Sequence, residues 1–163
     1  MLILRPYHTA DAGACLQLFD DNTPAFFSPT ERADFANFLA CYAEQWRFQV
    51  IERDARIVAC GGYAVNERGD SADLCWGMVA RDLHGTGLGK TITLARLQAA
   101  CAAPGIHRIR LDTSQHTQGF YARLGFRPTR IIADGYDKGL DRWEMELAVS
   151  ALHQQLNGAG ESP

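Results

Sequence analysis

The chain has 163 residues, of which 47% are hydrophobic and 21% charged, as in a globular protein with a substantial core. Sixteen lysines and arginines against 19 aspartates and glutamates give a formal net charge of −3. This balance argues against a protein that binds nucleic acid mainly through phosphate contacts.

Hydrophobic patterning divides the chain into alternating strands and helices. The expected strands cover residues 2–6, 48–52, 57–65, 72–79, 108–112, 129–132 and 143–147. The expected helices cover residues 9–20, 29–42, 88–103 and 117–124. This order predicts an α+β fold, an α/β sandwich around a mixed sheet of six to seven strands with four helices.

We expect one domain, because no linker or internal repeat interrupts residues 1–149. Residues 150–163 are expected to form a flexible C-terminal tail. The N-terminus lacks a signal-peptide core, and no apolar stretch approaches the roughly 18 residues of a spanning helix. Five widely spaced cysteines give no disulfide framework and no CxxC metal pair. These features favour a cytoplasmic protein without metal or membrane contacts.

A glycine-rich turn between an expected strand and an expected helix carries most of the functional information. The turn reads His84-Gly85-Thr86-Gly87-Leu88-Gly89 and is followed by Lys90 and Thr91. Glycines expose backbone N–H groups and let a ligand approach closely, and the following helix adds its positive dipole end. The segment therefore predicts an anion site, best suited to a phosphate or pyrophosphate.

Two nucleotide-binding motifs match this turn incompletely. A dinucleotide fingerprint requires GxGxxG, whereas the third glycine here comes one residue early. A phosphate-binding loop of nucleotide hydrolases requires GxxxxGK[ST], and Gly85–Thr91 is one residue short of it. A protein that binds nucleotides in this way stays open as an alternative.

The turn resembles the acyl-coenzyme A loop of the GCN5-related N-acetyltransferase (GNAT) family, Q/R-x-x-G-x-G/A, with His84 in place of Gln or Arg. Downstream, Phe120-Tyr121-Ala122-Arg123-Leu124-Gly125-Phe126 is similar to the family's (L/F)-Y-x-x-x-G-F signature. The resemblance spans about residues 2–148. It implies the acyl-CoA N-acyltransferase fold, with a mostly antiparallel sheet splayed between strands 4 and 5.

The same resemblance implies where acetyl-CoA binds as co-substrate. Backbone groups of Met78 and Val79 would pair with the pantetheine arm. The pyrophosphate would be held by amides of His84, Gly85, Thr86, Gly87, Leu88, Gly89 and Lys90. Ser114 stands where many relatives carry an asparagine that contacts the pantetheine region, although a role in capping a turn suits it equally.

Tyr121 is the candidate general acid, because a phenol keeps its proton near neutral pH and can give it to a departing thiolate. Asp73, where some relatives carry a catalytic glutamate, is the candidate base. His116 or a water molecule is the alternative base. A covalent intermediate on Cys75 is not expected, because no His or Asp stands at a recognisable partner spacing.

The implied reaction is acetylation of a primary amine by direct attack in a ternary complex. The acceptor is a small molecule or a peptide, and residues 25–29 with Asp134 and Tyr136 are expected to line its site. A homodimer is expected by analogy with relatives. A non-catalytic acyl-CoA sensor of the same fold is the second alternative.

Overall fold

The computed structural model describes residues 1–158, and within them seven strands are hydrogen-bonded in the order β1-β2-β3-β4-β5-β7-β6. The α+β class and the mixed sheet predicted from the sequence are confirmed. The chain divides into two compact units: residues 1–64 with 74–99, and residues 65–73 with those from 100 onward. The prediction of a single domain over residues 1–149 stays a prediction.

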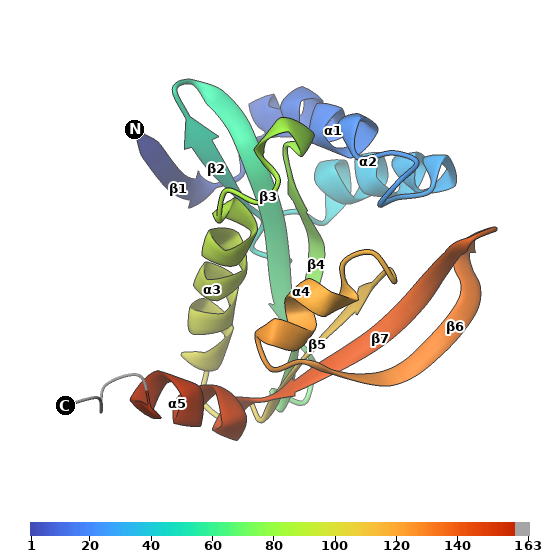
Figure 1. Cartoon of the computed structure of the whole chain (residues 1–163). Helices are drawn as coiled ribbons and strands as arrows, with labels where there is room; N and C mark the ends of the chain where they lie inside the picture. The colour runs from blue at the N-terminus through green and yellow to red at the C-terminus, as the bar shows by residue number, and fades with distance from the viewer. Residues whose placement is uncertain (159–163) are drawn as a thin grey trace. The chain divides into compact units, whose positions relative to one another are not determined.

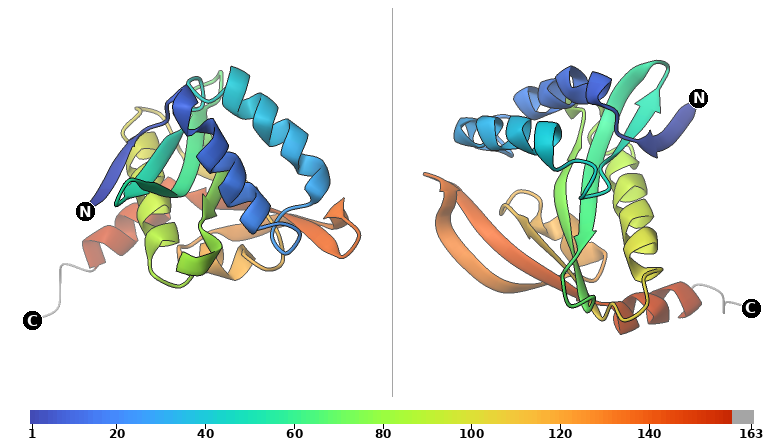
Figure 2. Two further views of the ribbon diagram at one scale, coloured as in Figure 1. Left: turned by 90° about the horizontal axis from the view of Figure 1, so that it is seen from above. Right: turned by 180° about the vertical axis from the view of Figure 1, so that it is seen from behind.

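The first unit contains an antiparallel set of strands with helices on both faces (Figures 1 and 2). Its strands are β1 (Leu2–Pro6), β2 (Gln49–Arg53), β3 (Arg56–Val65) and the larger part of β4 (Ser71–Val79). Figure 2 shows α1 (Ala12–Asp21) and α2 (Arg32–Cys41) on one face and α3 (Leu88–Cys101) on the other. Short 3-10 turns at Thr9–Asp11 and Pro29–Glu31 begin the first two helices.

Aromatic side chains form the core between the helix pair and the strands. Phe19 and Phe35 are fully buried, and the Phe35 ring stacks on Trp76 of β4 with centroids 4.8 Å apart. On the other face, Leu88 and Ile92 of α3 pack against buried residues of β2 and β3. Burial of these apolar side chains is the main stabilising contribution to the unit.

The second unit is built on three strands: β5 (Arg108–Thr113), β6 (Arg127–Asp137) and β7 (Leu140–Ala148). β6 and β7 form a long antiparallel hairpin, and β7 also pairs antiparallel with β5 (Figure 1). Side chains of β5 alternate strictly between exposed and buried, so one face of this strand carries its charges. β4 joins β5 in parallel at only three positions, where Ser71–Asp73 meets Arg108–Arg110.

The structure adds one helix and lengthens the last two strands relative to the sequence prediction. Helix α5 (Val149–Gly158) occupies the start of the expected flexible tail, and residues 159–163 lie outside the described residues. The described chain therefore has five α-helices instead of four. Strand β6 continues to Asp137, where the sequence predicted a loop from Asp134. None of the helices within residues 1–158 has the length and apolar character needed to span a membrane.

Candidate functional site

The glycine turn follows β4 in the first unit, as predicted. A 3-10 turn (η3, Arg81–Leu83) and His84 lead into it, and α3 begins at Leu88. Gly85 and Gly87 have φ angles of +77° and +91°, a region that side chains with a Cβ rarely adopt. No atom lies within 4 Å of the position that a Cβ would take on either glycine, so both face open space.

The turn presents unpaired backbone donors toward that space. The Thr91 amide donates to Gly87 O at 3.0 Å and is the first helical bond of α3. Helix geometry leaves the amides of Leu88, Gly89 and Lys90 without partners inside the helix. Lys90 and Thr86 are exposed on the same turn, while the Leu88 side chain is buried beneath it. These residues fit a pyrophosphate, because the donors converge at the positive end of a 14-residue helix.

His84 folds back onto the end of β4. Its Nε2 lies 3.1 Å from Val79 O, so this ring nitrogen carries the proton and donates it to the carbonyl. The Asn22 amide donates to the same carbonyl at 2.9 Å. Val79 O therefore already has two side-chain donors, a feature that the sequence did not reveal. The Phe26 ring contacts His84 edge-on at 5.2 Å and lies beneath the Arg81 guanidinium at 5.5 Å.

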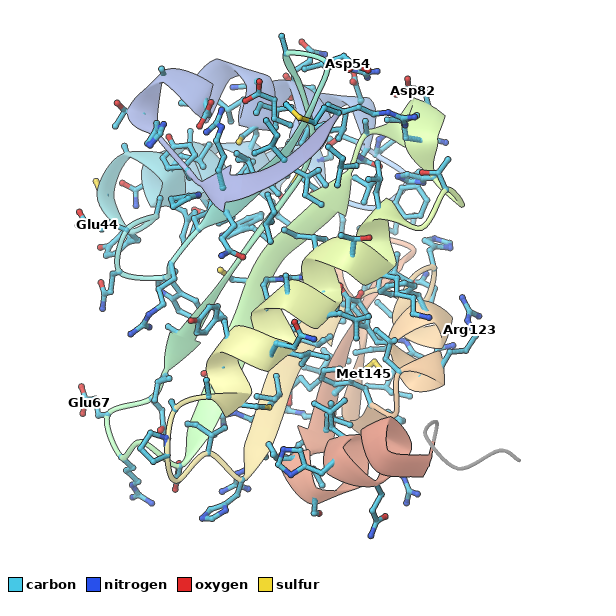
Figure 3. All side chains as sticks on the ribbon, turned by 90° about the vertical axis from the view of Figure 1, so that its left-hand side faces the viewer. Glu44, Asp54, Glu67, Asp82, Arg123 and Met145 are labelled. Atoms are coloured by element: carbon cyan, nitrogen blue, oxygen red, sulfur yellow. The ribbon has the colours of Figure 1, made fainter. Side chains whose placement is uncertain are left out.

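Figure 3 shows Asp82 at the outside of this turn, where it forms a bidentate ion pair with Arg56 at 2.8 Å. This ion pair lowers the pKa of the Asp82 carboxyl. The pair ties η3 to the start of β3 and leaves Asp82 charged beside the predicted anion site. Met78 is buried in the aromatic core, so only its backbone is placed to meet a ligand.

The predicted general acid lies in the second unit on α4 (Gln118–Arg123), from which Arg123 projects outward (Figure 3). The Tyr121 ring is partly buried and contacts Phe120 and Phe126 edge-on, with centroids 5.0 and 5.8 Å away. Its hydroxyl has no hydrogen-bond partner among the described residues, so the ring is held while the oxygen is available to a ligand.

Ser114, which is 3% exposed, closes the turn that precedes α4. Its hydroxyl accepts a hydrogen bond from the His116 amide at 3.2 Å, and its carbonyl accepts from the Gln118 amide at 2.9 Å. This is the turn-capping role that the sequence left open. Contact of Ser114 with pantetheine stays a prediction.

The predicted base is engaged by a neighbour. Asp73 forms a bidentate pair with Arg110, at 3.0 and 3.3 Å, across the short parallel register between β4 and β5. The two residues are 37 positions apart in the sequence, so the sequence alone did not predict this pair. Both oxygens of Asp73 accept from the guanidinium, so this carboxylate is less available to take a proton from a substrate.

Asp112 is a second carboxylate on the same face, and sequence reasoning missed it. It lies two residues after Arg110 on β5 and opposite Glu144 of β7. No hydrogen bond or ion pair holds Asp112 among the described residues. Burial raises the pKa of its carboxyl, with the nearby Arg142 acting in the opposite direction and Glu144 and Asp73 adding to the rise. A raised pKa makes this carboxylate a candidate for proton exchange.

Two of the residues expected to line an acceptor site have partners within their own unit of the chain. Phe27 packs on Phe19 and Trp76 in the aromatic core. Asp134 accepts from the Gly139 amide at 2.6 Å and so closes the end of the β6–β7 hairpin. Within the described residues, no group of three or more His, Cys, Asp or Glu side chains is placed to hold a metal ion.

Comparison with known proteins agrees with this arrangement. A family model described as an acetyltransferase (GNAT) domain matches residues 19–149. No curated protein sequence matches the chain.

Several solved structures share the fold. A protein from Desulfovibrio desulfuricans assigned to the GNAT family has a TM-score of 0.76 at 21% identity and covers 91% of this chain and 99% of its own. The ribosomal-protein-S18-alanine N-acetyltransferase of Escherichia coli has a TM-score of 0.75 at 19% identity, and the alignment covers 91% of this chain and 94% of the Escherichia coli protein. YncA of Salmonella typhimurium, solved with its cofactor acetyl-CoA, has a TM-score of 0.73 at 18% identity, and the alignment covers 91% of this chain and 94% of YncA. At these identities the likeness shows the fold alone.

Proposed function

The chain belongs to the GNAT acetyltransferase family, whose acyl donor is acetyl-CoA, and we propose that it acetylates a primary amine by direct transfer in a ternary complex. The observation that carries the proposal is the glycine turn at the start of α3. Gly85 and Gly87 adopt positive φ angles that residues with a Cβ rarely take, and the amides that follow are unpaired within the helix. Unpaired amides occur at every helix N-terminus, but here the two glycines also leave the space beside those amides open to a ligand.

In the proposed complex, acetyl-CoA supplies an acetyl thioester. Within the range His84 to Lys90, the amides of Gly85 and of Gly87 to Lys90 bind its pyrophosphate, since the His84 and Thr86 amides donate to Arg81 O and Leu83 O at 3.3 Å. The backbone at Met78 and Val79 pairs with its pantetheine arm. Val79 O already accepts hydrogen bonds from Asn22 and His84, so among the backbone groups of Met78 and Val79 it is the least available to pair with the pantetheine arm. The His84 ring therefore fixes the end of β4 in place of a direct side-chain contact with phosphate.

Tyr121 is proposed as the general acid. As the amine nitrogen bonds to the thioester carbonyl carbon, the carbon–sulfur bond breaks and the sulfur leaves with the electron pair. The Tyr121 hydroxyl donates its proton to that sulfur, and the phenolate regains a proton from solvent after release. The two aromatic neighbours of Tyr121 hold its ring in one orientation for this transfer.

A base must accept the proton that the amine loses on becoming an amide. Asp73 of β4 and Asp112 of the adjacent strand β5 are the two candidates, with a water molecule or His116 as alternatives. The bidentate pairing of Asp73 with Arg110 favours Asp112, or a water that Asp112 orders. We assign the base role to this pair of carboxylates, with Asp112 in the leading position.

The proposed acceptor is a primary amine of a small molecule or a peptide. The Escherichia coli relative is by name an alanine N-acetyltransferase of a ribosomal protein, which supports a peptide amine as one class to assay. No nucleic-acid partner is proposed, because the net charge is −3.

The test is release of coenzyme A thiol from acetyl-CoA in the presence of a panel of amines, with wild type and Tyr121→Phe. The wild type is expected to turn over at least one amine. The variant should lose about a hundredfold in kcat, with an unchanged Kd for acetyl-CoA. Coenzyme binding without turnover of any amine would instead favour the acyl-CoA sensor, and full activity of Tyr121→Phe would remove the acid assignment.

A further inference from the structure

A fully buried arginine lies in the middle of α3, and the mechanism above does not use it. Arg96 is 1% exposed, although an arginine is rarely buried without a carboxylate. No aspartate or glutamate in the described part of the chain forms an ion pair with it. The guanidinium instead faces two backbone carbonyls of neighbouring strands: Nη1 lies 3.4 Å from both Gly62 O and Cys75 O.

Two glycines on adjacent strands create the space for this side chain. A Cβ on Gly61 of β3 would lie 2.8 Å from the guanidinium carbon, and a Cβ on Gly77 of β4 would lie 2.8 Å from Nη2. Both positions therefore face α3, and a side chain at either position would have to displace the guanidinium of Arg96. The charge lies directly against the backbone of β4.

The backbone of β4 is irregular at the same point. Trp76 has a φ of +46°, an uncommon angle for a residue with a Cβ. Cys75 and Trp76 are adjacent, yet both side chains pack on the aromatic core, as in a β-bulge. Trp76 O lies 3.8 Å from the Cys60 thiol. Arg96 donates to the carbonyl of the peptide that joins Cys75 to Trp76.

This placement relates Arg96 to the acyl group, on the basis of the proposed function. The pyrophosphate is assigned to the turn after β4 and the pantetheine arm to Met78 and Val79. The thioester, at the far end of the arm, then lies next to the strand residues that precede Met78. Those are the residues behind which the guanidinium is buried.

We infer that Arg96 is a positioning residue for acyl transfer, acting through the β4 peptide between Cys75 and Trp76. Donation to that carbonyl polarises the peptide and strengthens its N–H as a donor. The buried positive charge also favours the negative charge that develops on the thioester oxygen as the amine attacks. The absence of a paired carboxylate leaves this field uncancelled.

A purely structural role for Arg96 predicts the opposite relation between stability and activity. If Arg96 served only to hold the strands, its loss would lower stability, and activity would fall with it. A buried charge without a carboxylate is costly, so a methionine of similar length is expected to keep the stability or raise it. The electrostatic role predicts that the stable methionine variant is slow.

The experiment compares wild type, Arg96→Met, Arg96→Lys and the control Leu97→Met, which changes another side chain of α3 that is 1% exposed. Three quantities are measured: the melting temperature, the Kd for acetyl-CoA, and kcat with the best amine. The infrared frequency of the bound acetyl carbonyl, labelled with carbon-13, reports its polarisation without any acceptor. Gly61→Ala, whose Cβ would displace the guanidinium, is the second variant should Arg96→Met not fold.

Arg96→Met is expected to bind acetyl-CoA within about threefold of wild type and to lose about tenfold or more in kcat, with a higher carbonyl frequency. Arg96→Lys should retain more of the rate, and Leu97→Met should match wild type. An unchanged kcat and carbonyl frequency in a folded Arg96→Met, or in Gly61→Ala, would overturn the inference. Failure of the wild type to bind acetyl-CoA would instead overturn the proposed function on which it rests.

Discussion

At the scale of single residues, the partner of a carboxylate decides what the carboxylate can do. Asp73 and Asp112 lie on one face of β5 and its neighbour, but only Asp73 has an arginine on both of its oxygens. The pKa of Asp112 is raised by burial. Such a difference between neighbouring acids is how proteins assign separate roles to the same residue type.

The first prediction concerns Asp112→Asn. Because the folded pKa of Asp112 is raised, its contribution to stability is present at low pH and is lost as the pH rises through that pKa. At pH 7 the ionised carboxylate opposes folding, so the variant should be slightly more stable than wild type, by less than about 1 kcal/mol. If Asp112 is the base, kcat should fall about tenfold or more.

Urea unfolding at pH 7 and pH 3 checks the stability part, since the difference should shrink at the lower pH. Asp73→Asn is the matched variant for activity. A larger loss of kcat in Asp73→Asn than in Asp112→Asn would return the base role to Asp73.

The second prediction concerns Asp11, which is 9% exposed at the start of the first helical segment. Arg5 donates to both of its oxygens at 2.8 and 2.9 Å, and the His8 amide donates at 2.8 Å. These bonds lower the pKa of Asp11, so its contribution to stability is present above the unfolded pKa of about 3.9. It is lost as the pH falls through the folded pKa.

Asp11→Asn should therefore reduce the free energy of unfolding by about 2 kcal/mol at pH 7, and by less as the solution is acidified below the folded pKa. Asp54→Asn removes an exposed carboxylate whose partner is the N-terminal amine and should change little. Urea denaturation of the three proteins across the acid range is the measurement. If Asp11→Asn lowered the free energy of unfolding equally at every pH, the stabilisation could not come from the ionised form of Asp11.

At the scale of elements, the hairpins and helices that follow from local pattern were predicted, and those that depend on distant residues were not. Strict alternation in β5 and the periodicity before Pro104-Gly105 located strand and helix well. The continuation of β6 to Asp137 was missed, because Asp134 and Gly135 are turn formers that here lie within the strand, where its register with β7 shifts. Helix α5 was missed because the glycines near the end of the sequence weighed against a helix.

The third prediction concerns the glycine turn as an element. Gly85→Ala or Gly87→Ala should cost about 1–2 kcal/mol of stability, because a Cβ is strained at these φ angles. Both variants should also weaken binding of acetyl-CoA more than tenfold, since the turn that aims the amides must rearrange. Calorimetric titration with acetyl-CoA gives the affinity, and chemical denaturation gives the stability.

Gly139→Ala is the strain-matched control, since Gly139 has a φ of +79° and equally open surroundings but lies in the β6–β7 hairpin. It should lose comparable stability and keep the wild-type affinity. Gly13→Ala, on helix α1, should gain stability by about 0.5–1 kcal/mol. Equal affinity in all four variants would show that the turn does not bind the coenzyme.

At the scale of the whole molecule, two short motifs in the right order were enough to predict the family and the fold. The anion-binding turn and the tyrosine signature are local in sequence, so both could be recognised. The Asp73–Arg110 pair, the donors on Val79 O and the burial of Arg96 could not, because each joins residues that only folding brings together. An arginine within a helical pattern is ordinarily expected on the surface.

The oligomeric state follows from none of these features, and the homodimer expected by analogy stays a prediction. Sedimentation of the full chain with and without acetyl-CoA would measure it directly.

The central claim is that the turn after β4 binds acetyl-CoA, and calorimetric titration of the wild-type chain with acetyl-CoA tests it most directly. ATP with magnesium is titrated in parallel. Saturable binding of the coenzyme alone is expected, with a gain in unfolding free energy of about 2.7 kcal/mol at a hundredfold excess over the Kd. Binding of ATP with magnesium but not of acetyl-CoA would contradict it and would reassign the turn to a nucleotide.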